Sequence, residues 1–491
     1  MARTPVTRLQ LDAYRFGQRR LESALARRDP VLLHEEIRGQ RRVVATGLAL
    51  AMLALVATFA YATLVPKPAW QAEQVVVGKQ SGRMFAVIQQ PPRLVPVANL
   101  AAARLVRYAS DREAGGGGSS ATAVPVQIDD ADLDKAPRTA TAAIPGAQAA
   151  LPTDDAPGTG MAGPWALCDT ARPGGALDTL LVAGAARTAP LGAAEGALLV
   201  GPDARRYLVI DGRKHRIDGG EVVAAAYDLR DKAVRPASAT LLAAIPDGRP
   251  LDTLEPADAG EDSSVLPGRA VGDVVRVVRP GEADRFYLVL AAGVQEVSEP
   301  VANLVRATLR ANRGRPPDTV RLEQINTLPR VSVPGLSGYP GVIPRIVSGP
   351  DTGAVCWQWG PDGRGGTVIA PPAPPVPPGQ ATTRLAQADG AGNKLDAVSL
   401  PAGSALVACA VSQGVDCSPR RDRDGGKANR ALWLVSATGV GYVIANDETA
   451  TALGVRTWTP VPVDALHMLP PGPTLDVAQA QRTVDVLAVG T

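Results

Sequence analysis

The sequence predicts an α+β, β-rich protein in which an N-terminal helix and a single transmembrane helix precede a large domain built of several modules. Three observations predict this class. The run from Val43 to Val65 is apolar and carries no charge. Downstream, short β-type runs alternate with turns, in a chain that holds 50 glycines and 44 prolines. The length of 491 residues also exceeds what one hydrophobic core supports, since single cores rarely grow past roughly 250–300 residues.

The overall composition excludes several classes of protein. Apolar residues make up 45% of the chain, so the protein can bury a sizeable core. The net charge of +3 excludes nucleic-acid binding through bulk positive charge. With three histidines and four cysteines, large metal-binding arrays are excluded too. No nucleic-acid partner, metal or cofactor is therefore expected.

The uncharged run, residues 43–65, is long enough to be the transmembrane helix. At 1.5 Å per residue it measures about 34 Å, against about 30 Å for the hydrocarbon core of a bilayer. Residues 1–42 hold ten arginines and five acids, so the positive-inside rule places them in the cytoplasm and the later chain outside. A cleaved signal peptide, ending near Ala60-Tyr61-Ala62, is a less favoured alternative, because the preceding region is long.

Residues 8–28, within the cytoplasmic region 1–42, are expected to form an amphipathic helix. Tyr14, Leu21 and Leu25 fall on one stripe, at spacings of seven and four residues. A lone helix of this length is only marginally stable in water, which favours docking of the stripe on a cytoplasmic partner. The alternative is a basic anchor that attracts anionic lipid.

Four windows of the external region read as an apolar run, a turn and an aromatic-x-aliphatic strand, which favours a duplicated module of hairpin plus helix. The windows are VVVGKQSGRMFAV (75–87), LLVGPDARRYLVI (198–210), RVVRPGEADRFYLVL (276–290) and LWLVSATGVGYVI (432–444). The first and third continue into a shared tetrapeptide, Val-Ala-Asn-Leu, at 97–100 and 301–304. Chance recurrence in a chain rich in alanine and valine is the alternative.

Two low-complexity segments interrupt these windows. Residues 114–160 contain GGGGSS and scattered aspartates, and are expected to be a flexible excursion. Residues 370–379, APPAPPVPPG, are expected to be a polyproline spacer.

The four cysteines, Cys168, Cys356, Cys409 and Cys417, all follow the span, on the side where disulfides persist. Three pairings are possible. Cys409 and Cys417 flank a glycine-containing turn, and Cys168 and Cys356 each have a tryptophan nearby. These features favour pairing within each couple, and the other two connectivities stay open.

No catalytic motif is visible. A Walker A loop needs G-x-x-x-x-G-K-[ST], but Lys79 is followed by glutamine and Lys427 by alanine. His34, His215 and His467 are widely separated, and no G-x-S-x-G or HExxH surrounds a serine or histidine. Each histidine is therefore interpreted as an ordinary surface or core residue.

The N-terminal block resembles a known family. It reads TRLQLDAYRFGQRRLESALARRDPVLLHEEIRGQRR (7–42), then one span, then VVVGKQSGRMFAV and VPVANLAAARLV. This looks like EccB, the single-span membrane component of the type VII (ESX) secretion system. The resemblance resumes at WALC (165–168), GYPGVIPRIVSGPDTGAVCWQW (338–359) and TPVPVDALHMLPPGP (459–473).

The resemblance implies a fold and a location. The fold is four repeat modules, similar to lysin subunits, around a central periplasmic β-domain with a disulfide that matches Cys168 and Cys356. The location is the bacterial inner membrane, with the N-terminus in the cytoplasm. The implied segments are the cytoplasmic helix region 1–42, span 43–65, repeat 1 at 66–113, excursion 114–160, central β-domain 161–196 and 331–395, repeat 2 at 197–265, repeat 3 at 266–330, repeat 4 at 396–458 and a C-terminal segment 459–491.

The resemblance also implies partners and a function. Family members assemble with the EccC motor ATPase, EccD, EccE and one another, near a mycosin protease. A structural subunit of the secretion complex is therefore expected. Two alternatives remain: an ATP-hydrolysing component, as the family is often labelled, and a peptidoglycan-binding module, which the lysin-like fold suggests.

Overall fold

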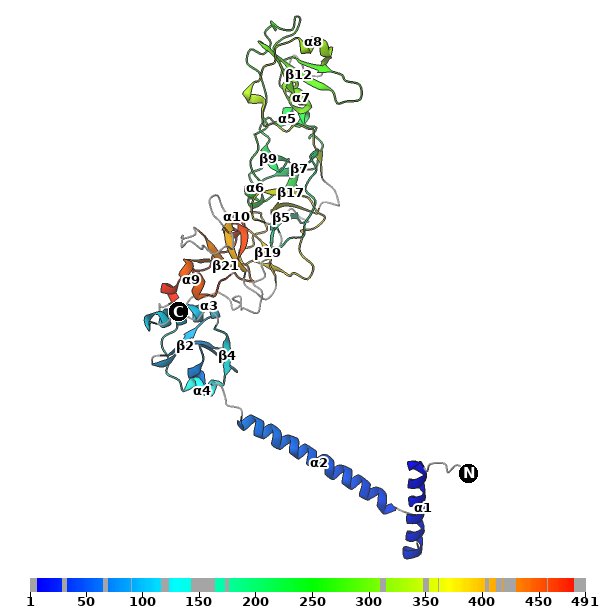
Figure 1. Ribbon diagram of the computed structural model, residues 1–491. Coiled ribbons are helices and arrows are strands. Elements are labelled where there is room, and N and C mark those ends of the chain that lie inside the picture. Colours follow the sequence, from blue (N-terminus) through cyan, green and yellow to red (C-terminus); the bar gives the residue numbers. More distant parts are fainter. Residues whose placement is uncertain are drawn as a thin grey trace. The chain divides into compact units, whose positions relative to one another are not determined.

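The computed structural model (Figure 1) contains two compact units, Met1–Ala69 and Trp70–Thr491. Each unit is described separately below. The described residues are 7–28, 33–64, 69–89, 91–115, 123–142, 164–172, 176–309, 315–347, 353–360, 362–401, 406–411, 417, 430–456 and 458–480.

The first unit consists of two helices, α1 (Arg8–Arg27) and α2 (Leu33–Leu64). The backbone amide of Thr7 donates to Oε1 of Gln10 at 3.1 Å and so closes the first turn of α1. Residues 43–64 of the predicted span lie in α2, which begins ten residues before Val43, and Val65 lies outside the described residues. The stretch Gln40–Tyr61 is long and apolar enough to cross a membrane, and none of it is buried. Its polar Thr58 is tolerated because the hydroxyl donates to the carbonyl of Ala54 at 3.0 Å.

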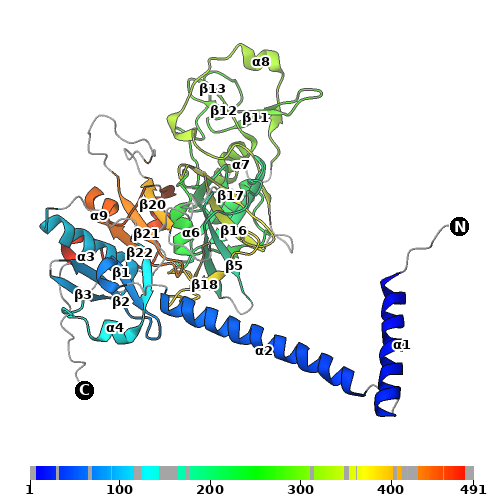
Figure 2. The same ribbon diagram turned by 60° about the horizontal axis from the view of Figure 1, so that its bottom comes forward.

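The second unit is α+β and β-rich, as predicted (Figures 1 and 2). Four of its sheets share one topology. In each, three strands form an antiparallel meander, and a later strand pairs in parallel with the first. We number them sheets 1 to 4. Asp211 and Gly212 form the two-residue turn between the second and third strands of sheet 2, and both have positive φ. Asp-Gly is a pair that such turns favour, so this turn could be expected from the sequence.

The strands are β1 (Val75–Gly78), β2 (Met84–Gln89), β3 (Pro92–Val97) and β4 (Pro125–Ile128) in sheet 1; β7 (Glu195–Val200), β8 (Arg206–Ile210), β9 (Arg213–Arg216) and β10 (Arg235–Pro236), with β15 (Arg345–Ile346) beside β7, in sheet 2; β11 (Val274–Val277), β12 (Arg285–Leu290), β13 (Gly293–Val297) and β14 (Asp318–Thr319) in sheet 3; and β20 (Leu406–Val411), β21 (Leu432–Val435), β22 (Gly441–Ile444) and β23 (Thr459–Pro462) in sheet 4.

Short helices connect the strands of these sheets. They are η1 (Trp70–Ala72), α3 (Leu100–Glu113) and α4 (Asp130–Asp134) around sheet 1; α5 (Gly220–Ala226) and α6 (Ala239–Ala244) around sheet 2; α7 (Glu299–Thr308), α8 (Leu322–Asn326) and η4 (Pro334–Leu336) around sheet 3; and α9 (Asp447–Ala452), α10 (Val463–His467) and α11 (Val477–Ala480) around sheet 4.

A fifth, six-stranded sheet is assembled from distant parts of the chain, and we call it the central sheet. Its order is β17-β16-β5-β6-β19-β18. Its strands are β5 (Ala166–Ala171), β6 (Leu177–Val182), β16 (Ala354–Trp359), β17 (Gly366–Ile369), β18 (Thr382–Arg384) and β19 (Ala397–Ser399). The chain between β6 and β16 forms sheets 2 and 3 before it returns to pair β16 with β5.

Hydrophobic cores are shared between sheets. One core joins buried residues of sheets 1 and 4, where α3 contacts α9 and α11 (Figure 2). A second joins one face of the central sheet to sheets 2 and 4. Sharing is needed because a single sheet of short strands has too little apolar surface for independent stability.

The predicted excursion at residues 114–160 differs from the structure. Its middle part forms β4 and α4, and β4 pairs in parallel with β1. Ile128 and Leu133 are thereby buried in the core of sheet 1. The glycine-rich segment 116–122 and residues 143–160 lie outside the described residues.

The expected boundaries of repeat 4 also differ from the sheet that forms there. β19, inside the predicted 396–458, belongs to the central sheet, while β23, inside the predicted C-terminal segment 459–491, closes sheet 4. The fourth sequence window is shifted as well. It covers β21 and β22, the second and third strands, whereas the other three windows cover the first and second strands.

The shared tetrapeptide Val-Ala-Asn-Leu does not mark equivalent positions. At 97–100 it joins the end of β3 to the start of α3, and Asn99 caps that helix by accepting from the amide of Ala102 at 2.8 Å. At 301–304 it lies inside α7, whose N-cap is Ser298. The two copies therefore occupy different places relative to their helices.

The proline-rich segment 370–379 contains no strand, as predicted, but it is more than a spacer. The amide of Ala354 donates to the carbonyl of Pro371 at 3.0 Å, and that of Ala186 donates to Pro375 at 2.9 Å. Val376 packs against the buried disulfide face of the central sheet. The segment thus covers that face.

Candidate functional site

The predicted docking residues lie together on α1. Tyr14, Leu21 and Leu25 are 65%, 65% and 83% exposed. With 3.6 residues per turn, they fall on one side of the helix. Leu11 and Gln18, which the sequence analysis did not include, complete spacings of three and four residues along this side, and the amide of Gln18 donates to the hydroxyl of Tyr14 at 3.1 Å. We call these five residues the α1 stripe.

The two cysteine pairs are both bonded in the structure. Cys168 and Cys356 are directly opposite in the central sheet, on β5 and β16, with their Cα atoms 4.0 Å apart. Cys409 at β20 is bonded to Cys417, with a Cα separation of 5.8 Å. Trp458 covers the latter pair, because its indole Nε1 donates to the carbonyl of Cys417 at 2.9 Å. These are the pairs that the cysteine spacing and the tryptophans favour.

Two arginines of α3, one buried and one exposed, join sheet 1 to sheet 4. Arg104 on α3 is fully buried, and its guanidinium donates to the carbonyl of Leu453 after α9 at 2.9 Å and to that of Ala123 at 3.3 Å. Arg112 forms an ion pair with Glu448 on α9. A buried guanidinium bonded to backbone carbonyls is costly to disturb, so this contact fixes the relative position of the two sheets.

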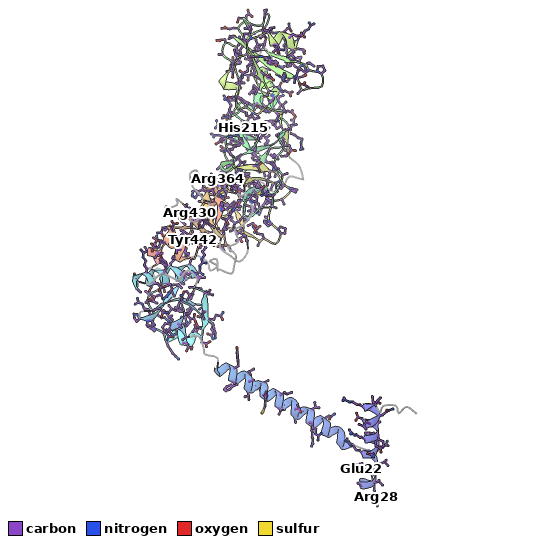
Figure 3. All side chains as sticks on the ribbon, viewed as in Figure 1. Glu22, Arg28, His215, Arg364, Arg430 and Tyr442 are labelled. Atoms are coloured by element: carbon purple, nitrogen blue, oxygen red, sulfur yellow. A yellow bond between two sulfur atoms is a disulfide. The ribbon has the colours of Figure 1, made fainter. Side chains whose placement is uncertain are left out.

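The histidines and lysines that sequence reasoning considered do not form a reactive group among the described residues. His215 (Figure 3) lies buried on β9, where its Nδ1 is 2.8 Å from the carbonyl of Arg249, and burial lowers its pKa. His467 contacts the ring of Trp433. Lys79 lies after β1 and pairs with Asp129 at 3.1 Å. Lys427 and the side chain of His34 lie outside the described residues.

Two buried carboxylates of the central sheet were not found by sequence reasoning. Asp169 on β5 accepts from the amide of Ser238, the N-cap of α6, at 2.6 Å, while its Oδ1 has no hydrogen-bond partner among the described residues. Burial raises the pKa of Asp169 to about 6. Asp396 accepts from the amides of Thr179 and Gly390 at 2.9 and 2.8 Å. Isolated aspartates in an Ala/Asp-rich chain give no sequence signal of such burial.

We expect Asp169→Asn to raise stability at neutral pH. The pKa of this group is higher in the folded state than the 3.8 of the unfolded state, so folding is favoured while the carboxyl is protonated and this contribution is lost as pH rises through about 6. The stabilisation at pH 7.5 should be at most about 3 kcal/mol, at 1.36 kcal/mol per pKa unit. Thermal melts of the full chain between pH 4 and 7.5 measure it. The exposed Asp231→Asn is the control, and an unchanged pH dependence in Asp169→Asn would refute the assignment.

Comparisons with known proteins place the whole chain in one group. A family model described as "Type VII secretion system ESX-1, transport TM domain B" matches residues 3–489. The "ESX-1 secretion system ATPase EccB1" of Mycolicibacterium smegmatis is 27% identical, with 98% of this chain and 96% of that protein covered. The "ESX-3 secretion system ATPase EccB3" of Mycobacterium tuberculosis is also 27% identical, over 98% and 90%.

Two solved structures have the same fold. One is the structure of an intact ESX-5 inner membrane complex. A chain of that complex is 24% identical to this chain, with a TM-score of 0.66, and the match covers 100% of this chain and 98% of that one. The other is the EccB3 dimer from the ESX-3 core complex, with 24% identity, a TM-score of 0.63 and coverage of 83% and 99%.

Proposed function

Because the chain belongs to the EccB family of type VII secretion system membrane proteins, we propose that it is a structural subunit of an ESX membrane complex. The observation that carries the proposal is the family match from residue 3 to 489, together with one exposed apolar helix, Gln40–Tyr61, of membrane-spanning length. In this proposal α1 is cytoplasmic, α2 crosses the inner membrane, and the unit from Trp70 onward is periplasmic.

We infer that sheets 1 to 4 are copies of one module around the central sheet. Their common strand order supports this. So does the pair of asparagines that cap α3 and α9: Asn99 and Asn446 each follow the third strand, and each accepts from the amide three residues later at 2.8 Å. A chain of linked modules offers a large surface on which a multi-subunit periplasmic assembly can form.

The proposed partners are further copies of this chain, the EccC motor ATPase, EccD, EccE and a mycosin protease. Support comes from the family and from the titles of the similar structures, which describe an inner membrane complex and an EccB3 dimer. The α1 stripe is the proposed contact with the motor complex, because its apolar side chains have no cover within the described part of the first unit.

Native mass spectrometry of membranes solubilised in mild detergent tests the proposal. Purification through a tag on this subunit should yield a complex with several copies of the chain and additional membrane subunits. A chain that always elutes alone from its native membrane would contradict the structural role.

The second candidate function is ATP hydrolysis, which the names of the relatives carry. Of the two lysines closest to a Walker motif, Lys79 already pairs with Asp129. If the purified full chain hydrolyses ATP, and still does so in Lys79→Ala and Lys427→Ala, the result would favour this candidate. The ATP site would then not be of the Walker type.

A further inference from the structure

Helix α5 of sheet 2 lies against helix α7 of sheet 3 (Figure 1). A hollow of about 730 Å³ is lined by residues of both helices. Three arginines, from three separate segments of the chain, converge on it. The hollow is lined by Glu221, Val222, Ala225, Ala226 and Arg230, from α5 and the turn after it, and by Asn303, Arg306, Ala307, Arg315 and Pro316, from α7 and the segment before β14. Among the described residues, this lining carries three positive charges and one negative charge.

Arg306 is the central cation of this hollow. It is half-buried on the last turn of α7, and burial lowers its pKa. The end of the helix favours a positive charge, but it supplies no carboxylate. Within the described part of the chain, Arg306 makes no ion pair. A partly desolvated guanidinium of this kind retains its affinity for an external anion.

The other two arginines, Arg230 and Arg315, have a carboxylate nearby, but these carboxylates compensate their charges only weakly. Arg230 lies 3.6 Å from Glu221, and both side chains are mostly exposed to water. Arg315 is exposed near Asp318, but that carboxylate is bonded to Arg269. An ion pair as exposed as Arg230–Glu221 contributes little free energy, so an incoming anion can replace Glu221 as the partner of Arg230.

The small apolar residues that line the hollow leave it open and limit the kind of ligand that it can hold. Ala225, Ala226 and Ala307 are too small to fill the space between the helices, and Val222 and Pro316 add apolar surface. Guanidinium groups bind phosphate oxygens through two parallel hydrogen bonds. The volume exceeds that of a phosphate ion alone, so it also accommodates a compact organic body against the alanines.

We propose that this hollow binds a phosphate ester, with Arg306 as the main ligand and Arg230 and Arg315 as flanking ligands. The site is additional to the assembly role and does not depend on it. Bound between α5 and α7, such a ligand would also fix the orientation of sheet 3 relative to sheet 2, because it would contact both helices.

Calorimetric titration of the full chain in non-ionic detergent, at constant ionic strength in chloride, tests the proposal. Inorganic phosphate is the first probe, followed by glycerol 3-phosphate and soluble dihexanoyl phosphatidylglycerol. We expect all three to bind, and Arg306→Gln to weaken binding at least about tenfold, since hydrogen bonds to charged groups are the stronger ones. Tighter binding of glycerol 3-phosphate would identify a soluble ester as the source, and tighter binding of the lipid would identify a headgroup.

Controls separate the site from general effects of charge and folding. Arg206→Gln, an exposed arginine on β8, should bind the probes like the unmodified chain. Arg306→Gln should melt at an unchanged temperature, because Arg306 makes no ion pair within the described residues. Equal loss in both variants, equal binding of chloride and phosphate, or no binding of any probe would overturn the proposal.

Discussion

Replacement of Tyr14 and Leu21 by serine is expected to release the chain from its partner complex and stop secretion, while the chain stays in the membrane. Both side chains are 65% exposed on the α1 stripe. Burial of one such side chain at an interface contributes about 1.5–3 kcal/mol. Loss of two should therefore weaken the contact by at least about a hundredfold, since 1.4 kcal/mol is tenfold. Membrane insertion should persist, because the uncharged run from Val43 to Val65 is unchanged.

Co-purification with the complex and export of a reporter substrate are the measurements. Leu9→Ser with Phe16→Ser is the matched control, because these apolar residues are also exposed but project from the other side of α1. It should leave assembly intact. Rescue of the stripe variant by an unrelated basic amphipathic helix would show that α1 is only a lipid anchor.

Removal of the Cys168–Cys356 disulfide, as Cys168→Ala with Cys356→Ala, is expected to cost about 5 kcal/mol of unfolding free energy in the chain-entropy model. The bond closes a loop of 188 residues, within which sheets 2 and 3 lie. It also joins two strands that are neighbours in the central sheet only because the chain returns after that loop. Urea unfolding of the full chain in detergent, with peptide mapping of the unmodified protein under non-reducing conditions, measures the effect.

The second disulfide is the matched control. Cys409 and Cys417 close only eight residues, so Cys409→Ala with Cys417→Ala should cost about half as much. Free thiols at Cys168 and Cys356 in the unmodified protein, or an equal loss from both double variants, would contradict this account.

Several features could be predicted from local sequence because one segment contains all the information. The amphipathic helix was expected at 8–28 and lies at Arg8–Arg27. Residues 43–64 of the uncharged run lie within α2. The apolar stripe of α1 follows from the periodicity of the helix alone. The hairpins of the first three windows likewise depend on neighbouring strands joined by short turns.

Whatever depends on residues far apart in the chain was decided only by the tertiary structure. The strands that close the sheets, such as β4 and β14, are two to four residues long and show no periodicity, and parallel pairing with the first strand is what stabilises them. Asn99 of the first tetrapeptide is the N-cap of its helix, whereas Asn303 of the second lies five residues after the N-cap Ser298, and the local sequence does not reveal this shift. Burial of Arg104 and Asp169 has the same cause: in each case, segments distant in sequence cover the side chain and supply its hydrogen bonds. The sequence by itself thus predicted the membrane-spanning run and the local elements of this protein, while long-range packing decided the closing strands, the strand order that four of the sheets share and the arginine hollow.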